Sequence, residues 1–363
     1  MTIPDIFKKQ KWLWLTEFLV IVAIKLLAQN NSFVETFYST NFYKFFSIFL
    51  RFLFGWIPFS IGDILYLSAG CWILWKVIKN CALILKRRFS KELFFKKLSK
   101  LVLLSGGIYI VFNIFWGLNY DRKTIAAQMD LPSIIYDTAN LKVIQQLLLK
   151  KVNESKQILI DKNVVYPKNN ELFQRAKTCY AEACVEYPFI QYDAASIKSS
   201  FFGKMGDYLG FTGYYDPFTG EAQVNTTVPK FLLPYITLHE MGHQLGYAKE
   251  DEANFSGYLA AANSSDTLFR YSTYLDLFLY ANREVFYFDS TASKLAARQL
   301  IPAVKTDLQE WRLFNARYTS VIEPAISWLY GKYLQVNKQP KGLRSYNEVI
   351  ATLMAYYKKN GRI

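Results

Sequence analysis

Histidine is nearly absent from this 363-residue chain, which contains two histidines. A metal site with three histidine ligands is therefore excluded, and a third protein ligand would have to be Asp, Glu or Cys. Cysteine is also rare, with four residues. Cys179 and Cys184 could form a disulfide in an oxidising compartment, but their spacing in a predicted helix leaves both states open. They are weaker metal ligands than an acidic residue, because thiolates are more typical of closed structural sites.

Both histidines lie in one pentapeptide, His239-Glu240-Met241-Gly242-His243, which has the pattern H-E-x-x-H. Residues four apart on a helix share one face, so both imidazoles can bind one metal ion. Glu240 then stands beside that ion and can take a proton from its bound water. Pro234 suits a first helical turn, Gly246 suits the position after a helix end, and the flanking residues are apolar. The sequence therefore predicts a buried metal-binding helix over residues 234–245.

The third ligand is sought in the residues that follow this helix. The metzincin pattern would place a histidine at position 249, which is Lys249. Glu250, Ala253 and Asn254 come next and share one helical face. We predict that Glu250 is the third ligand, that Ala253 lets the helices approach closely, and that Asn254 holds the outer nitrogen of a ligating histidine. Glu252 is the alternative ligand, and an acidic helix start stabilised by the helix dipole also explains this cluster.

Long apolar runs are concentrated in the first 118 residues, which we predict to be a membrane region with about three transmembrane helices. The run 101–118 has no charged residue and the length of a short membrane span. The runs 12–28 and 59–77 contain a few charges and are weaker candidates. The stretch 42–56 is aromatic and apolar but is broken by two basic residues, so we expect it to be interfacial or re-entrant. The lipid bilayer is the partner that this composition predicts.

The net charge of +14 does not indicate a nucleic-acid-binding protein, because most of it belongs to the membrane region. Residues 1–100 hold 15 Lys and Arg against 5 Asp and Glu, a balance of +10, and the rest hold 28 against 24, a balance of +4. Basic loops stay in the cytoplasm, so we expect a multi-pass protein of the cytoplasmic membrane with a cytoplasmic N-terminus. Residues 119–363 would then form an extracytoplasmic domain. The first apolar run lacks a small-residue cleavage site, so we expect it to remain as an anchor.

The 245 residues after Leu118 are enough for a single globular domain, and they contain neither internal repeats nor a low-complexity linker. We predict a mainly α (α+β) fold, with helices at 141–159, 171–185, 234–245, 251–262, 266–287, 293–318, 324–335 and 345–358. Aromatic and β-branched residues on either side of Asp216-Pro-Phe-Thr-Gly220 predict a β-hairpin. The hairpin is either a structural ribbon or the rim of a cleft that pairs with an extended peptide.

Two resemblances add to this prediction. The E-x-x-A-N run of Glu250–Asn254 after H-E-x-x-H resembles the gluzincin pattern, although Glu250 follows His243 by only seven positions, closer than usual in that group. More closely, the chain resembles an uncharacterised bacterial family of membrane-anchored H-E-x-x-H proteins, domain of unknown function 3810. The resembling stretches are Gly55–Asp63, Asn119–Arg122, Pro217–Ala222, Leu238–Gly246 and Glu250–Asn254. These resemblances imply a zincin-like domain that binds Zn²⁺, and they bring no substrate.

The function that these residues favour is a membrane-anchored zinc metallopeptidase. His239, His243 and Glu250 would hold Zn²⁺, which polarises the scissile carbonyl of a peptide or protein substrate and lowers the pKa of its water towards ~7. Glu240 would be the general base and would return the proton to the leaving amine.

Tyr271 or Arg270 would stabilise the oxyanion from the helix after Asp266. Two alternatives remain, a metal-binding membrane sensor or scaffold, and a metallohydrolase acting on non-peptide envelope material. An intact Glu240 favours an enzyme over a sensor.

Overall fold

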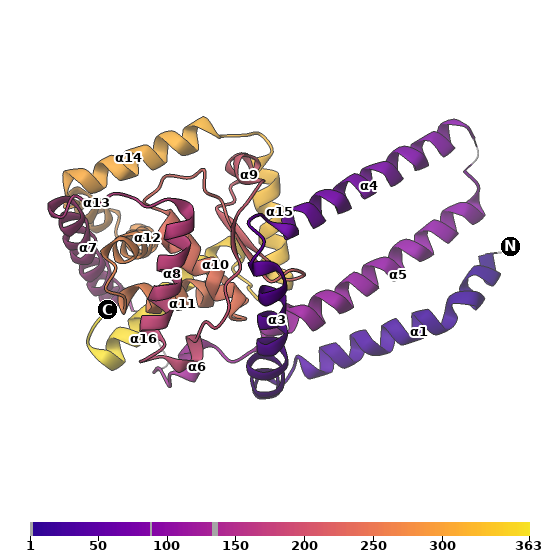
Figure 1. Ribbon diagram of the computed structural model, residues 1–363, viewed down its shortest axis with the longest axis horizontal. Helices are drawn as coiled ribbons and strands as arrows, with labels where there is room; N and C mark the ends of the chain where they lie inside the picture. The colour runs from indigo at the N-terminus through magenta and orange to yellow at the C-terminus, as the bar shows by residue number, and fades with distance from the viewer. Residues whose placement is uncertain (1–2, 88, 133–136) are drawn as a thin grey trace.

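The computed structural model describes residues 3–87, 89–132 and 137–363. The fold is mostly helical with one small sheet, and it has two parts. Long helices project from one side of a globular helical body, which contains most of the residues after 120 (Figure 1). The mainly helical class predicted from the sequence is confirmed.

The projecting part consists of α1 (Ile3–Leu27), α4 (Ile61–Leu85) and α5 (Lys91–Phe115). Among the described residues, α4 and α5 are each long and apolar enough to cross a membrane. The segment Gln10–Leu27 forms a pair with Asn31–Gly55 that is bent by 94°, so a third span exists only if this bent pair is one broken span. Two of the three expected spans are therefore supported directly. The predicted span 101–118 ends earlier, because α5 gives way at Trp116 to a 3₁₀ turn, Gly117–Asp121.

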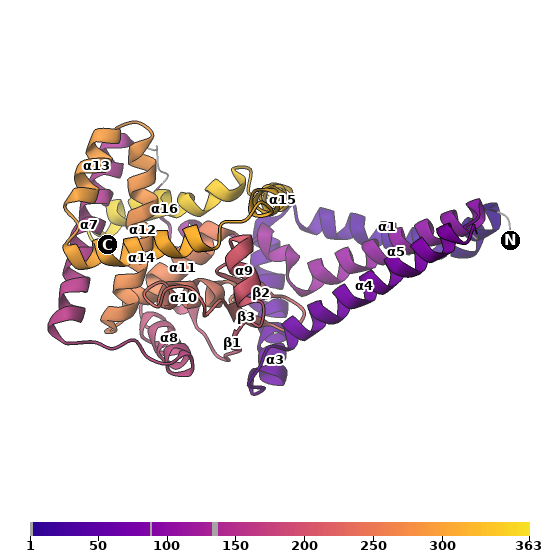
Figure 2. The same ribbon diagram turned by 90° about the horizontal axis from the view of Figure 1, so that it is seen from above.

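The segment after α1 lies across the base of the projecting helices (Figure 2). It contains the short α2 (Asn31–Phe33), a π-helix (Val34–Phe42) and α3 (Tyr43–Gly55). This arrangement agrees with the expectation that residues 42–56 do not continue as an ordinary span. Ser60 then caps α4, because its hydroxyl accepts a hydrogen bond from the Asp63 amide.

The body is built from helices of mixed length. They are α6 (Ile125–Gln128), α7 (Thr138–Asp161), α8 (Asn169–Ala183), α9 (Gly203–Leu209), α10 (Leu233–Gln244), α11 (Glu250–Ala262), α12 (Thr267–Phe286), α13 (Ser290–Arg298), α14 (Pro302–Arg317), α15 (Glu323–Val336) and α16 (Val349–Asn360), with 3₁₀ turns at Pro188–Ile190 and Gly342–Glu348. The predicted helix 293–318 is wrong as a single element. Pro302 lacks an amide hydrogen and begins a new helix, so α13 and α14 are separate.

A three-stranded sheet with the order β1-β3-β2 lies beside α10. β2 (Gly213–Asp216) and β3 (Glu221–Val224) are antiparallel, which confirms the predicted hairpin. Asp216 Oδ1 accepts hydrogen bonds from the amides of Phe218 and Thr219 in the turn, and Gly220 has φ +70°. The sequence did not predict β1 (Ile197–Ser199), which pairs parallel to β3. β2 is left at the edge of the sheet.

Buried polar contacts join the projecting part to the end of α10. The Arg122 guanidinium pairs with Glu35 at 2.8 and 3.0 Å and donates a 3.0 Å hydrogen bond to the Leu245 carbonyl. Tyr43 Oη donates to the Gln244 carbonyl at 3.1 Å, and Trp116 Nε1 donates to the neighbouring carbonyl of the same helix at 3.3 Å. The end of the H-E-x-x-H helix is thus held by the segments that flank α1, α4 and α5.

Candidate metal centre

The H-E-x-x-H helix, α10, is buried along its whole length except at Ile236. Pro234 occupies its first turn, and Gly246 takes φ +84° just after its end, which only glycine adopts without strain. A Cβ on Gly242 would lie 3.1 Å from the Ala253 carbonyl oxygen. The small residues Gly242 and Ala253 therefore let α10 and α11 approach closely, as we predicted for Ala253.

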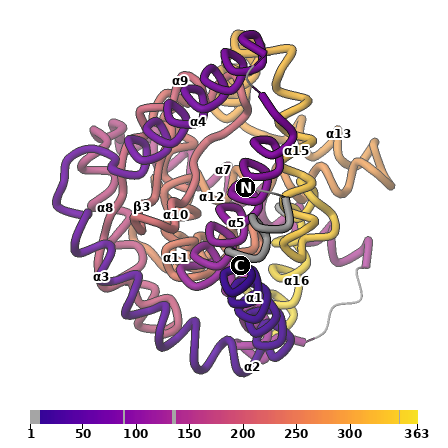
Figure 3. Tube along the Cα trace, turned by 90° about the vertical axis from the view of Figure 1, so that its right-hand side faces the viewer, coloured from indigo at the N-terminus to yellow at the C-terminus, as the bar shows by residue number. Residues whose placement is uncertain are grey.

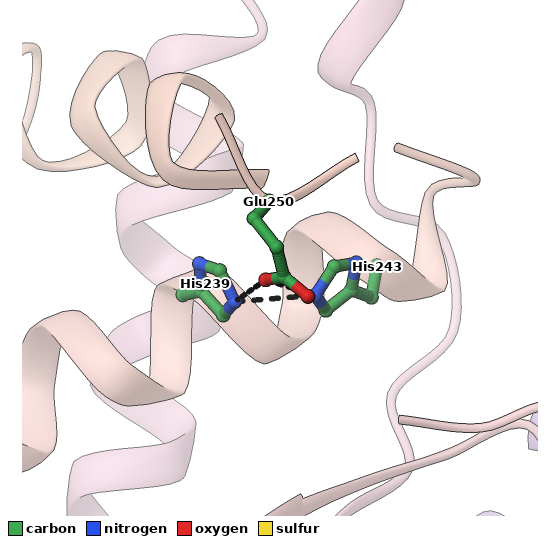
Figure 4. Close-up of side chains that lie close together, drawn as sticks. All are labelled: His239, His243 and Glu250. Carbon is green, nitrogen blue, oxygen red and sulfur yellow. Dashed lines mark hydrogen bonds and ion pairs between the residues drawn. The ribbon is translucent and has the colours of Figure 1, made fainter. Parts of the chain in front are cut away.

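This close approach brings Glu250, at the start of α11, over the two histidines (Figure 4). The two Nε2 atoms lie 3.1 Å apart, and Glu250 Oε2 lies 3.2 Å from that of His239 and 3.5 Å from that of His243. Ligand atoms 2.0–2.1 Å from a tetrahedral ion lie about 3.3 Å from one another. The three side chains, called the metal cluster below, are therefore spaced to hold one metal ion. The described residues contain no other such group.

The outer nitrogens of both imidazoles are held by acceptors, so each Nε2 faces the cluster. His239 Nδ1 lies 2.7 Å from Asn254 Oδ1, the contact expected from the sequence, and His243 Nδ1 lies 2.7 Å from the Tyr247 carbonyl oxygen. Both acceptors select the tautomer with a proton on Nδ1 and a lone pair on Nε2. Two imidazole nitrogens with this tautomer and one carboxylate form an ordinary zinc ligand set.

Two carboxylate oxygens in this site are buried and accept no hydrogen bond from the described residues: Glu240 Oε2 and Glu250 Oε2. Glu250 Oε1, in contrast, accepts a 2.6 Å hydrogen bond from the Tyr330 hydroxyl. A buried carboxylate oxygen without a donor is costly unless a cation balances it. The site therefore fits a cation between the histidines and Glu250.

Mutual electrostatics within the cluster shift the pKa values strongly. Burial acts to lower the pKa of His239, but Glu250 and Glu240 outweigh it and raise that pKa to about 9. Burial likewise acts to raise the pKa of Glu250, yet both imidazoles hold it well below its usual range. Burial raises the pKa of Glu240 to about 7, against the opposing effect of the histidines. A metal ion would replace the proton shared within this cluster.

Gly213 on β2 is a site residue that sequence reasoning missed. A Cβ at this position would lie 2.4 Å from Glu240 Oε1 and 2.8 Å from the Gln223 carbonyl oxygen. The edge strand therefore passes directly against the Glu240 carboxylate. A glycine inside a predicted strand is the signal that could have indicated such a close backbone approach.

A cleft of about 550 Å³ contains the cluster. Its lining comes from α10, α11, β2, α12, α14, α15 and the body ends of α4 and α5. It includes Tyr66, Phe112, Trp116, Gly213, Tyr214, Tyr215, His239, Glu240, His243, Glu250, Asn254, Asp276, Tyr280, Arg283, Trp311, Tyr330 and Tyr333. Tyr280, Arg283 and Tyr330 are polar lining residues that were not predicted, and the Tyr330 hydroxyl contacts Glu250 directly. They come from elements far along the chain, and no local pattern marks them.

Three other predicted residues lie outside the metal cluster. Glu252 Oε2 accepts a 2.5 Å hydrogen bond from the Ile125 amide, away from the histidines. The Tyr271 hydroxyl donates to Asp307 at 2.5 Å, and Arg270 Nη2 donates to Thr267 Oγ1 at 3.1 Å. Neither Tyr271 nor Arg270 lines the cleft, because a different stripe of α12 faces it. The geometry therefore favours Glu250 over Glu252 and gives no support to an oxyanion role for either α12 residue.

The described cysteines are all free, Cys179 and Cys184 included. Cys179 is buried in α8, and burial raises the pKa of its thiol to about 12. A thiol in this state is neither a metal ligand nor reactive. In the structure, Cys179 and Cys184 are therefore free thiols and do not form a disulfide.

A family model described as "Protein of unknown function (DUF3810)" matches residues 38–354. The chain belongs to the DUF3810 family. No curated protein and no solved structure matches it. The resemblance to this family is confirmed, and the matched range contains the metal cluster, both hairpin strands, α4 and α5. The DUF3810 description assigns no activity, so the function has to be argued from the cleft itself.

Proposed function

We propose that this protein is a membrane-anchored, zinc-dependent metallopeptidase with a zincin-like site. The observation that carries the proposal is the arrangement of four side chains in one cleft. His239, His243 and Glu250 present three donor atoms 3.1–3.5 Å apart, and the buried Glu240 carboxylate lies beside them. Three protein donors leave a coordination position open, which is typical of catalytic rather than structural zinc.

A zinc ion bound here would polarise a substrate carbonyl and lower the pKa of water to about 7. Glu240 follows a ligand directly in sequence, and its Oε2 has no hydrogen-bond donor among the described residues. In the proposal, this oxygen accepts the proton of the attacking water and delivers it to the leaving amine. Gly213 leaves room for this carboxylate, because a Cβ at that position would lie 2.4 Å from Glu240 Oε1.

Strand β2 supports a peptide as the substrate. It is the edge strand, it lines the cleft, and Gly213 touches Glu240. Asn225 donates to the Thr212 carbonyl, so in the alternating antiparallel ladder the backbone groups of Gly213 and Tyr215 point away from β3. An extended peptide can pair with these groups and pass its scissile bond over the metal cluster.

Tyr330 on α15 replaces Tyr271 and Arg270 as the proposed oxyanion donor. Its hydroxyl lies 2.6 Å from Glu250 Oε1, and its side chain lines the cleft. A phenol at this distance from a ligand oxygen can turn to a negatively charged oxygen that develops near the metal.

We propose further that the body faces the extracytoplasmic side. The start of α1, the end of α4 and the start of α5 lie at the far end of the projecting part (Figure 1). The basic clusters of the sequence, around residues 8–11 and 76–100, belong to this end. Basic segments stay cytoplasmic, so the body with its cleft would lie on the opposite face.

The experiment compares the wild type with Glu240→Gln and with Glu154→Gln, a change of an exposed glutamate on α7. Each protein is reconstituted into vesicles with zinc and given bacterial membrane polypeptides, and new N-termini are mapped by amine labelling. Wild type and Glu154→Gln should release the same set of N-termini. Glu240→Gln should retain one zinc and release none. Zinc binding without any new N-termini in the wild type would refute the peptidase and favour a metal-binding sensor.

A further inference from the structure

One end of the cleft is formed by the membrane helices themselves. Tyr66, in the second turn of α4, and Phe112, in the last turn of α5, both line it together with Trp116. α4 and α5 are also the two described helices that are apolar and long enough to span a membrane. The cavity that contains the metal cluster therefore reaches the level at which these helices leave the body.

α4 and α5 do not cover each other along their length. In the most apolar 18-residue window of each, only 11% and 6% of the residues are buried. A contact between Lys97 and Asn80 joins them towards the turn that links them, far from the body. Seen along their length, α5 lies between α4 and α1 (Figure 3), and α1 packs against α5. The apolar lengths of α4 and α5 are thus exposed rather than buried in a helical bundle.

Helix α15, which lies next to the base of α4, gives a second indication of where the membrane surface lies (Figure 1). Ile322, Leu329 and Val336, seven residues apart, lie on one face and are 57%, 55% and 82% exposed, and Trp328 beside them is 63% exposed. This helix lies at the base of α4 (Figure 1) and carries Tyr330 and Tyr333 into the cleft. A helix with an exposed apolar face next to membrane spans is suited to the headgroup boundary.

The cleft also has polar lining residues that come from helices remote from α4. Asp276 and Arg283 of α12 line it together with Trp311 of α14, and both helices lie on the far side of the body from α4 (Figure 2). A substrate lying along this cleft would place an apolar part beside Tyr66 and Phe112 and a polar part beside Arg283. His239, His243 and Glu250 line the same cleft as these residues.

We infer that the substrate reaches the cleft from within the bilayer, through the side between α4 and α5, and is a polypeptide cut close to its own membrane anchor. The inference rests on the proposed peptidase function and specifies its substrate class. The anchor lies against Tyr66 and Phe112, and the adjacent polar segment extends along β2 past Glu240. A soluble polypeptide far from any anchor is a poor substrate.

The first test varies the distance between the anchor and the cleavage sequence. Two reporters carry the same anchor of about 20 Leu and Ala residues and the same sequence, taken from an N-terminus mapped in the first experiment. In one the sequence follows the anchor directly, and in the other a polar spacer of about 40 residues separates them. Both have the same concentration in the vesicle, so local concentration does not distinguish them. Cleavage of the directly joined reporter should be at least about tenfold faster, and equal rates would overturn the inference while leaving the peptidase intact.

The second test does not require turnover. A photoreactive amino acid replaces Tyr66, Phe112 or, as a control, Leu295, an exposed residue of α13, in the Glu240→Gln protein. Illumination in vesicles with the same anchor of about 20 Leu and Ala residues, joined directly to any polar segment, should cross-link the anchor at positions 66 and 112 and not at 295. Cross-linking at 66 and 112 without cleavage by the wild type would refute the peptidase but not the route from the bilayer. Absence of cross-links at both positions would refute the route.

Discussion

The contact between Asn254 and His239 gives the most direct test of the metal centre. Asn254 is 2% exposed, and its Oδ1 lies 2.7 Å from His239 Nδ1. This acceptor fixes the imidazole ring and keeps the Nε2 lone pair directed at the cluster. Asn254→Ala removes the acceptor and leaves a buried N–H without its partner when the ring is fixed by a metal ion.

The expected loss follows from the cost of that donor. A buried donor without a partner costs about 1–3 kcal/mol. This cost falls on the metal-bound protein, in which the ion fixes the His239 ring. Without metal the ring can reorient and pair with the Glu250 carboxylate, which lies 3.2 Å from its Nε2. Zinc affinity should therefore fall about 5- to 150-fold, which spans the 10–100-fold that loss of such partners typically causes.

The assay is a competition titration of zinc against a fluorescent chelator in detergent, with thermal unfolding measured on the same samples. Asn254→Asp keeps the acceptor and should bind zinc within a few-fold of the wild type. Asn263→Ala, at the other end of α11, is the matched control, because its side chain bonds the Leu259 carbonyl far from the cluster. Wild-type zinc affinity in a folded Asn254→Ala protein would refute the assigned role.

The other predictions concern the third ligand, the oxyanion donor and a buried acid. Glu250→Gln should abolish stoichiometric zinc in metal analysis, and Glu252→Gln should retain it, since its carboxylate bonds the Ile125 amide. Tyr330→Phe should lower kcat about 100-fold with zinc retained, whereas Tyr271→Phe should leave kcat unchanged and cost about 1 kcal/mol of stability in unfolding experiments. Burial raises the pKa of Asp216 from 3.8 to about 6, so the native state binds this proton more tightly. Protonation of Asp216 should contribute up to about 3 kcal/mol to the free energy of unfolding below pH 4, and this contribution should be lost as the pH rises through 6. Thermal unfolding at several pH values measures it, and Asp216→Asn should not show this pH dependence.

The parts of the site that could be predicted are those that depend on helical spacing. His239 and His243 are one turn apart, and Glu250 and Asn254 are one turn apart on the next helix, so each pair shares a face whatever the rest of the fold does. The brief connection between the helices leaves them few ways to pack. Geometry therefore agrees with the choice of Glu250 and with the contact between Asn254 and His239.

The parts that could not be predicted depend on contacts between distant segments. Tyr330 lies 80 residues after Glu250, and Gly213 approaches Glu240 only because the edge of the sheet lies beside α10. Choosing Tyr271 required knowledge of which stripe of α12 faces the cleft, and periodicity alone does not supply it, since both faces of α12 are largely buried. β1 has three residues and pairs with a strand more than 20 positions away, too short a pattern to recognise.

The structure also changes how the membrane region should be understood. The last carbonyl groups of a helix have no partners within it and need donors from elsewhere. At the end of α10 these donors are Tyr43, Trp116 and Arg122, which come from the segments that flank the membrane helices. The same end of α10 carries His243, whose orientation depends on the Tyr247 carbonyl just beyond. The segments that flank α1, α4 and α5 are therefore structural parts of the candidate metal centre, which is the arrangement that the proposed entry of substrate from the bilayer requires.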